Sequence, residues 1–436
     1  MVMKMKLKML IFLFASLFFI LTETGAAEVK PGLEQCIEKA LQNNHDYIAQ
    51  QKKVEETGFK LFQQITNVLP QIDSSASYYR YEYELPSKKA LFGISNDDYY
   101  ADISLKQILF AGGKNIGLIS SAAAGNDAEK AKLESIKRNI IYSVKKAYYD
   151  LAKTVFAYDT QKELYEKLKA QANIAQILYS GGKISNLDLL KIQTQVLSTG
   201  DSLRNLQELK GIKELILGQA MGVSETVDVQ IDIPEPSENE KIKEIDEAIW
   251  INNNPEIIYF KKLLDKADSE ITTARADFFP SIYIRANYFM EDKVFFPGNP
   301  NWYAGVALTI PVFHWGGIFA QVKQAEARKE QVSETQKQTE LAISIKYRSA
   351  KASFYEKKDR FKTMKKIIEL SKQALDTAEL KYNSGKLSVL ELIDAQTVWF
   401  NAVLNYKNVI VEYYMAKADL ETIYPDAIEE EKNENQ

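Results

Sequence analysis

Two short stretches of the sequence, 203 residues apart, carry the same pattern. Residues 179–188 read YSGGKISNLD and residues 382–391 read YNSGKLSVLE. Each stretch places a tyrosine three residues before a glycine–lysine pair, and a serine three residues before a carboxylate. A glycine in a polar cluster between two long periodic segments is typical of a tight turn. The sequence therefore predicts an internal duplication in which each half contains a helix, a tight turn and a second helix.

The rest of the chain repeats in the same order, which sets the predicted domains. Leu69-Pro70 has a counterpart in Phe279-Pro280, and Gly112-Gly113 has one in Gly316-Gly317. We predict a first structural repeat at 28–221, an equatorial linker at 222–244 and a second structural repeat at 245–424. The linker is expected to contain a short strand, because apolar residues alternate from Val227 to Ile233. The acidic residues 425–436 are predicted to form a disordered tail.

A heptad pattern runs through the longest segments of both halves. Apolar residues there recur at alternating spacings of four and three, which is typical of packed long helices. The pattern predicts helices at 113–180, 186–219, 317–382 and 386–422, and the third would extend for about 100 Å. Helices this long leave apolar edges that only equally tall neighbours can cover, so side-by-side packing around an axis would enclose a tunnel. The heptad residues are Ile140, Val144, Ala147, Leu151, Tyr158, Tyr165, Leu168, Ala172, Ala175 and Tyr179, with Ile343, Tyr347, Ala350, Phe354, Phe361, Met364, Ile368, Leu375, Ala378 and Tyr382.

Four shorter segments have the period-two pattern of strands with one apolar and one polar face. We predict these strands at 70–82, 99–110, 281–290 and 301–311, with aromatic residues gathered at their ends. A four-stranded sheet has two open edges, which are costly in lipid, so other copies of the chain would have to pair with them. Two or three copies would give eight or twelve strands. The alternative is a pair of soluble hairpins that pack on the helices.

The first 27 residues are typical of an exported protein. Three lysines precede an apolar run from Met9 to Leu21, and four small or polar residues follow at 24–27. We predict a signal peptide at 1–27, because about thirteen apolar residues are too few to cross a bilayer as a retained helix. Its removal takes away three Lys and one Glu, which changes the formal charge from −4 to −6. This acidic balance gives no reason to expect nucleic-acid binding.

The side chains that catalysis and metal binding require are scarce in this sequence. His45 and His314 are the only histidines, and Cys36 is the only cysteine. Gly112-Gly113-Lys114 lacks the upstream glycine and the following Ser or Thr of a phosphate-binding loop. We therefore predict no enzyme activity, no cofactor site and no metal site.

The duplicated order of these motifs resembles the TolC-like outer-membrane efflux proteins, the outer membrane factors of tripartite efflux and type I secretion systems. The motifs are the glycine joints after the strands and the paired Tyr-x-x-Gly-Lys turns. The resemblance covers essentially the whole mature chain. It implies a mainly α fold with a small β part, in which a homotrimer forms a helical α-barrel and a shared 12-stranded transmembrane β-barrel. It also implies an outer-membrane location with a periplasmic extension, in a Gram-negative type of envelope.

The same resemblance implies a constriction and a docking region at the turns. The constriction would use tyrosines and rings of carboxylates, which favour cations. Relatives often carry an arginine where this chain has Leu387, next to Lys386. From the residues alone, a solvated helix surface beside a turn is the alternative. The expected constriction residues are Tyr179, Asp188, Tyr382, Lys386, Glu391 and Asp394, and the expected adaptor-docking residues are Gly182, Ser185, Gly385 and Ser388.

The predicted function is that of a passive exit duct in the outer membrane. It would be opened by a periplasmic adaptor (a membrane fusion protein) and an inner-membrane transporter that dock at the turns. Drugs, metal ions and proteins are all compatible with the sequence as cargo. The alternative is a soluble periplasmic coiled-coil adaptor or scaffold, which would share the heptads but would not need strands that face lipid.

Overall fold

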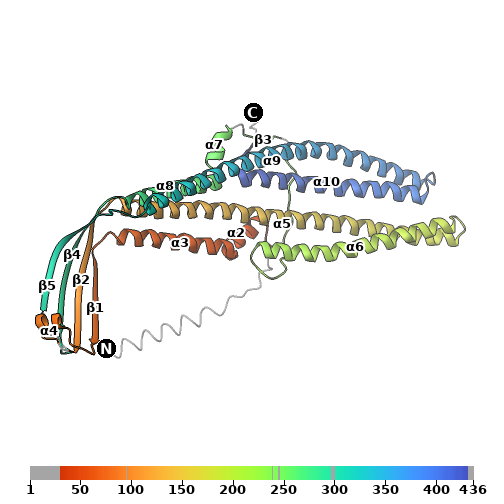
Figure 1. Cartoon of the computed structure of the whole chain (residues 1–436). Coiled ribbons are helices and arrows are strands. Elements are labelled where there is room, and N and C mark those ends of the chain that lie inside the picture. The colour runs from red at the N-terminus through yellow and green to blue at the C-terminus, as the bar shows by residue number, and fades with distance from the viewer. Residues whose placement is uncertain (1–29, 95, 238, 244–245, 296–299, 431–436) are drawn as a thin grey trace, which may run out of the picture. The chain divides into compact units, whose positions relative to one another are not determined.

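The computed structural model describes residues 30–94, 96–237, 239–243, 246–295 and 300–430. The predicted signal peptide and residues 431–436 of the predicted tail lie outside this part of the chain. The predicted fold class, mainly α with a small β part, is confirmed (Figure 1). No helix in the described ranges combines the length and apolar character needed to cross a membrane.

The two repeats contain the same long helices and the same pairs of strands. The long helices lie within three residues of their predicted limits, and the strands lie within two. Helices α5 and α9 contain 67 residues each, and α6 and α10 contain 35 each. The first repeat comprises α2 (Leu33–Asn43), α3 (His45–Thr66), β1 (Gln71–Arg80), α4 (Pro86–Phe92), β2 (Asp97–Ala111), α5 (Lys114–Ser180) and α6 (Asn186–Ala220). The linker and the second repeat comprise β3 (Glu240–Ile242), α7 (Glu247–Asn252), α8 (Pro255–Ala276), β4 (Ser281–Asp292), β5 (Pro300–Thr309), α9 (Gly317–Asn383), α10 (Val389–Ile423) and β6 (Ile428–Glu430).

A repeated asparagine interrupts the helix at the start of each repeat. Asn44 separates α2 from α3, and its side-chain oxygen accepts hydrogen bonds from the backbone amides of Asp46 and Tyr47. Asn254 does the same between α7 and α8, where it accepts from the amide of Glu256 at 3.0 Å. Asparagine is a preferred N-cap because it satisfies amides that have no partner inside the helix. The repeated asparagine therefore marks a helix start in both halves.

The linker differs from the prediction of a strand between Val227 and Ile233. The hydroxyl of Tyr148 donates to the carbonyl of Gln230, and the amide of Gln230 donates to the carbonyl of Pro31 at 3.2 Å. These contacts replace the hydrogen bonds of a neighbouring strand, so this segment is not part of a sheet. The linker strand is β3, and it pairs with β6. The tail therefore has regular structure up to Glu430, where the sequence suggested disorder.

Four strands form one antiparallel sheet in the order β1-β2-β4-β5. A bulge between Ile108 and Phe110 shifts the register of β2 against β4. Strands β1 and β5 are the two edges, and each has ten residues. The segment between β1 and β2 contains α4, which begins at Pro86 and is capped at its end by Gly93 with a φ of 67°. Proline suits the first turn of a helix and glycine suits its left-handed end.

The chain divides into two compact units, and each unit draws on both repeats. The turn unit comprises Met1–Ala40, Val144–Pro236 and Thr363–Val411, and the sheet unit comprises Leu41–Ser143, Ser237–Lys362 and Glu412–Gln436. Heptad residues such as Phe354 and Leu168 are fully buried in their own unit. The core of the sheet unit joins α7, α8, α9 and α10, and the core of the turn unit joins α5, α6 and α10. Most of the buried heptad residues therefore belong to the helical cores of the two units.

Candidate functional site

Both turns of the turn unit end a long helix in the same way. Gly182 has a φ of 69° and donates its amide to the carbonyl of Tyr179 at 2.9 Å, while the next amide reaches the carbonyl of Leu178. Gly385 has a φ of 71° and donates to the carbonyl of Tyr382, also at 2.9 Å. This pair of bonds is the Schellman motif, which needs a left-handed residue, usually glycine. The two glycines that were predicted to contact an adaptor therefore have a structural role in the turns.

The serine three residues after each glycine begins the next helix. Ser185 accepts a hydrogen bond from the amide of Asp188 at 3.1 Å and donates its hydroxyl to the Asp188 carboxylate at 2.8 Å. At the second turn, the backbone amide and the hydroxyl of Ser388 both donate to Glu391, at 2.9 and 2.7 Å. This reciprocal arrangement is a capping box. It explains why both turns carry a serine and a carboxylate at the same spacing.

The second turn holds its carboxylate in the charged form. The hydrogen bonds from the amide and the hydroxyl of Ser388 lower the pKa of Glu391, with a smaller contribution from Lys381. Asp394 is exposed one turn further along α10. Two negative side chains therefore lie in the first two turns of α10.

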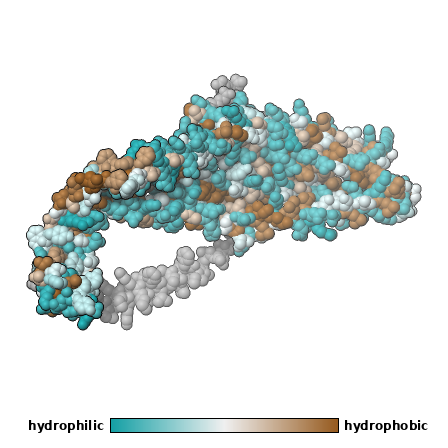
Figure 2. Space-filling view, viewed as in Figure 1, coloured by the Kyte–Doolittle hydropathy of each residue, from teal (hydrophilic) through white to brown (hydrophobic). Residues whose placement is uncertain are grey.

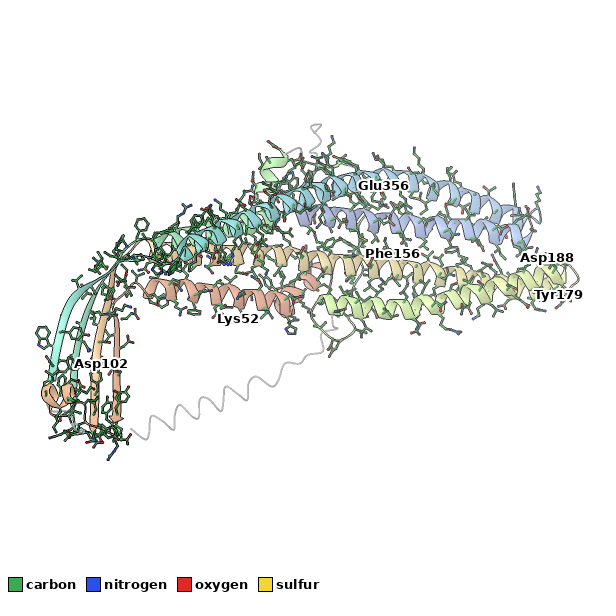
Figure 3. The ribbon with its side chains drawn as sticks, viewed as in Figure 1. Lys52, Asp102, Phe156, Tyr179, Asp188 and Glu356 are labelled. Atoms are coloured by element: carbon green, nitrogen blue, oxygen red, sulfur yellow. The ribbon has the colours of Figure 1, made fainter. Side chains whose placement is uncertain are left out.

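The two tyrosines of the repeated motif lie in different surroundings. Tyr179 has 39% of its surface exposed, and Figure 3 shows it with Asp188 beside the first turn. Tyr382 packs against both buried clusters of the turn unit, one with Leu168 and Ile192 and the other with Leu375. Leu387 packs on the same cluster as Leu375, and Lys386 is exposed. Leu387 is therefore half-buried against the apolar core of the turn unit.

A pair of glutamines, of which one is buried and the other half-buried, joins the two helical hairpins and was not predicted. The side-chain amide of Gln171 on α5 donates to Oε1 of Gln396 on α10 at 2.8 Å. Gln396 is buried, whereas its repeat counterpart Gln193 is exposed. The equal register of Gln193 and Gln396 was visible in the sequence, but their spacing does not say which one faces a neighbouring helix.

The sheet separates a polar face from an apolar face, as the alternation predicts. Directly paired residues share a face, so the register places Asp102 (Figure 3) and Ser104 on β2 with Asn287 on β4. The hydroxyl of Tyr100, on the same face, accepts from the side chain of Asn287 at 3.3 Å. Ile103 lies on the opposite face and is more than half exposed. Both edge strands are exposed along nearly their whole length.

The described residues contain no group of three or more His, Cys, Asp and Glu side chains placed to hold a metal ion. Cys36 is a free thiol buried in the turn unit, and burial raises its pKa. A buried thiol with a raised pKa is a poor nucleophile.

Long helices paired through capped turns, together with a two-faced antiparallel sheet that has open edges, define the class of outer-membrane channel proteins. The sequence model of the outer membrane efflux protein family matches residues 36–223 and 249–424, and the chain belongs to this family. The predicted family and the outer-membrane location are thereby confirmed. Membership also supports the channel over the soluble adaptor.

Individual relatives extend over most of the chain. The solvent efflux pump outer membrane protein SrpC of Pseudomonas putida is 25% identical over 405 residues, which are 85% of this chain and 80% of that protein. The probable outer membrane lipoprotein SilC of Salmonella typhimurium is 23% identical over 85% of this chain and 81% of its own length. Nodulation protein T of Rhizobium leguminosarum bv. trifolii is 22% identical over 63% of this chain, and the match spans 61% of that protein.

Solved structures of outer membrane channels share the fold. The Campylobacter jejuni CmeC outer membrane channel superimposes with a TM-score of 0.78 at 19% identity, over 92% of this chain and 87% of that chain. The open state of the Neisseria gonorrhoeae MtrE outer membrane channel gives a TM-score of 0.77 at 19% identity, over 90% of this chain and 88% of that chain.

Proposed function

We propose that three copies of this chain form a passive exit duct in the outer membrane, which serves an efflux or type I secretion system. The duct has no catalytic activity and binds no cofactor. An inner-membrane transporter supplies the energy, and a periplasmic adaptor connects the transporter to the turns of the duct. The open edges of the four-stranded sheet are the observation that carries this proposal.

The sheet cannot be closed by one chain. Strands β1 and β5 are both unpaired edges among the described residues. Each strand has ten to fifteen residues, which is sufficient to cross the hydrocarbon core at a tilt. An unpaired backbone group in lipid costs several kcal/mol, so the edges must pair with other copies. Three copies supply twelve strands, which close with the apolar faces toward lipid and the polar faces toward the interior.

Exposed apolar side chains on the helices support the same assembly. Figure 2 shows hydrophobic surface along α6 and, in the sheet unit, at the junction of β5 with α9. Apolar area of this extent is typical of an interface. We infer that neighbouring copies cover it. The exposed residues are Leu187, Leu190, Leu197, Ile212 and Leu215 on α6, and Val312, Phe313 and Trp315 before α9.

The turns are proposed as the constriction and the docking region. Threefold symmetry would turn Asp188, Glu391 and Asp394 into three rings of carboxylates, which favour cations and repel one another as they approach. Tyr179, Tyr382 and Lys386 would line the same end. The adaptor would bind the exposed turn residues Gly182, Ser185, Gly385 and Ser388.

The named relatives favour small molecules as cargo. Relatives from Pseudomonas putida are components of efflux pumps for solvents, toluene and antibiotics. A passive duct makes few contacts with its cargo, so selection would belong to the transporter. The proposal therefore assigns the chain to efflux ahead of protein secretion.

Light scattering of the full-length protein in mild detergent tests the assembly. We expect the protein mass of three chains, and a stable, folded monomer would overturn the proposal. Leu197→Asp tests the helical interface, because Leu197 is 74% exposed in the single chain. The variant is expected to lose the trimer, since three copies of a buried, unpaired carboxylate are costly. The neighbouring exposed variant Ser198→Asp is the matched control and should remain trimeric.

A further inference from the structure

The short helix α4 is held against one end of the sheet by a single lysine. In the sequence, α4 lies between β1 and β2, and in the structure it lies beside the ends of the strands (Figure 1). Lys88 forms an ion pair with Asp98 of β2 and a second one with Glu291 of β4 at 2.8 Å. The hydroxyl of Tyr81 also donates to Asp98, at 3.4 Å. The segment after the helix is anchored as well, because Ile94 is fully buried.

The ion pairs identify the face of the sheet on which α4 lies. Side chains alternate along a strand, so Asp98 shares a face with Asp102 and Ser104. Glu291 is paired directly with Tyr100, which places it on the same face. Both carboxylates that bind Lys88 therefore lie on the polar face. Helix α4 is folded onto this face and not onto the apolar one.

The contact is buried and depends on one positive charge. The side chain of Asp98 is 1% exposed and that of Glu291 is 10% exposed, while Lys88 is 30% exposed. Oδ1 of Asp98 has no hydrogen-bond partner in the described part of the chain. One ammonium group thus balances two buried carboxylates. Without it, two buried negative charges would remain side by side, which is strongly unfavourable.

We propose that α4 narrows the loop-side mouth of the duct, and that its attachment through Lys88 to Asp98 and Glu291 determines how large a solute can enter from that side. This inference rests on the proposed function, in which the polar face lines the interior. Three copies would place three α4 helices around one opening. Helix α4 and both ion-pair partners of Lys88 lie within the sheet unit.

Cysteine labelling in intact cells tests the inference on the full chain. In a Cys36→Ser background, Ser104→Cys reports the interior face and Ile103→Cys reports the lipid face. A small membrane-impermeant maleimide should label Ser104→Cys and spare Ile103→Cys. A maleimide on a bulky polymer should label Ser104→Cys slowly. Adding Lys88→Met should make the bulky reagent label about tenfold faster, because uncompensated buried charges free the helix.

Two further variants separate the possible outcomes. Lys89→Met is the matched control, because Lys89 pairs with the exposed Glu84 and should leave the labelling rate unchanged. Glu291→Gln keeps the ion pair between Lys88 and Asp98, so it should accelerate labelling less than Lys88→Met does. If Lys88→Met does not reach the outer membrane, Glu291→Gln still tests the inference. If neither variant accelerates the bulky reagent while the small reagent still distinguishes the two faces, the inference is wrong and the duct stands. Equal labelling of Ser104→Cys and Ile103→Cys by the small reagent would instead overturn the proposed duct.

Discussion

The two turns of the turn unit share their backbone and differ in their surroundings. At each turn, the amides of the glycine and of the lysine after it make the same pair of terminal bonds, and both following helices begin with a serine cap. The side chains around the second turn are more strongly engaged. Tyr382 packs on two buried clusters, whereas Tyr179 has 39% of its surface exposed. Ser388 donates two hydrogen bonds to Glu391, whereas Ser185 donates one to Asp188.

This comparison distinguishes the features that both turns need for their backbone shape from the features that only one turn has. The terminal glycine and the capping serine serve the local fold, so both copies need them. The environment of the tyrosine depends on which helices lie next to each turn. A structural role common to both turns predicts equal effects of matched substitutions, and a special role of the second turn predicts unequal ones.

The largest expected difference concerns the tyrosines. Tyr382→Ala should lower the free energy of local opening at the ends of α9 and α10 by about 3 kcal/mol, because it removes a ring from two clusters. Tyr179→Ala should cost less than about 1 kcal/mol, because 39% of the residue is already exposed to solvent. Hydrogen exchange of the helix-end amides in the assembled protein measures both values. Equal losses of opening free energy at the two turns would show that the difference in packing does not affect stability.

A smaller effect is expected at the glutamine pair between the hairpins. Gln396→Leu should cost about 2 kcal/mol, because it leaves the side-chain amide of the half-buried Gln171 without its acceptor. The double variant Gln171→Leu with Gln396→Leu should recover part of this loss, since two apolar groups need no hydrogen bond. Thermal unfolding in detergent measures the stability of the unsubstituted protein, of Gln396→Leu and of the double variant. The exposed counterpart variant Gln193→Leu is the control, and a loss as large as that of Gln396→Leu would contradict the assignment.

The glycines should behave alike at the two turns. Gly182→Ala and Gly385→Ala should each cost about 1 kcal/mol, because both residues have a positive φ that disfavours a side chain. A Cβ atom at either position would meet no neighbouring atom within 4 Å, so the cost is conformational only. Hydrogen exchange at the two turns provides the measurement. A clearly larger loss at one turn would point to a contact made by that glycine in the assembly.

Much of this architecture is predictable from the sequence because it follows local rules. Heptad spacing, the prolines and the repeated glycines define the long helices, and strict alternation from Tyr99 to Lys106 defines β2. The family and the outer-membrane location follow from the duplicated order of these motifs.

Contacts between distant segments were less predictable. Alternation from Val227 to Ile233 suggested a strand, but a strand needs a partner, and Tyr148 and Pro31 occupy its place. The pairing of β3 with β6 joins residues 240–242 to 428–430, which no local pattern reveals. The capping roles of Ser185 and Ser388 were visible in their spacing from a carboxylate, whereas the contacts of Gln396 and Lys88 depend on the tertiary fold.

The smallest expected effect is a pH dependence that belongs to the second turn. Hydrogen bonds from Ser388 lower the pKa of Glu391 below its ordinary value. Because the folded-state pKa is the lower one, the cap is fully formed above the unfolded pKa of about 4.3 and is lost as the pH falls through the folded-state pKa. Exchange of the first-turn amides of α10, corrected for its intrinsic pH dependence, should therefore increase only below about pH 4. Glu391→Gln should abolish this dependence because it cannot ionise, and a dependence that survives the substitution would assign the titration to another group.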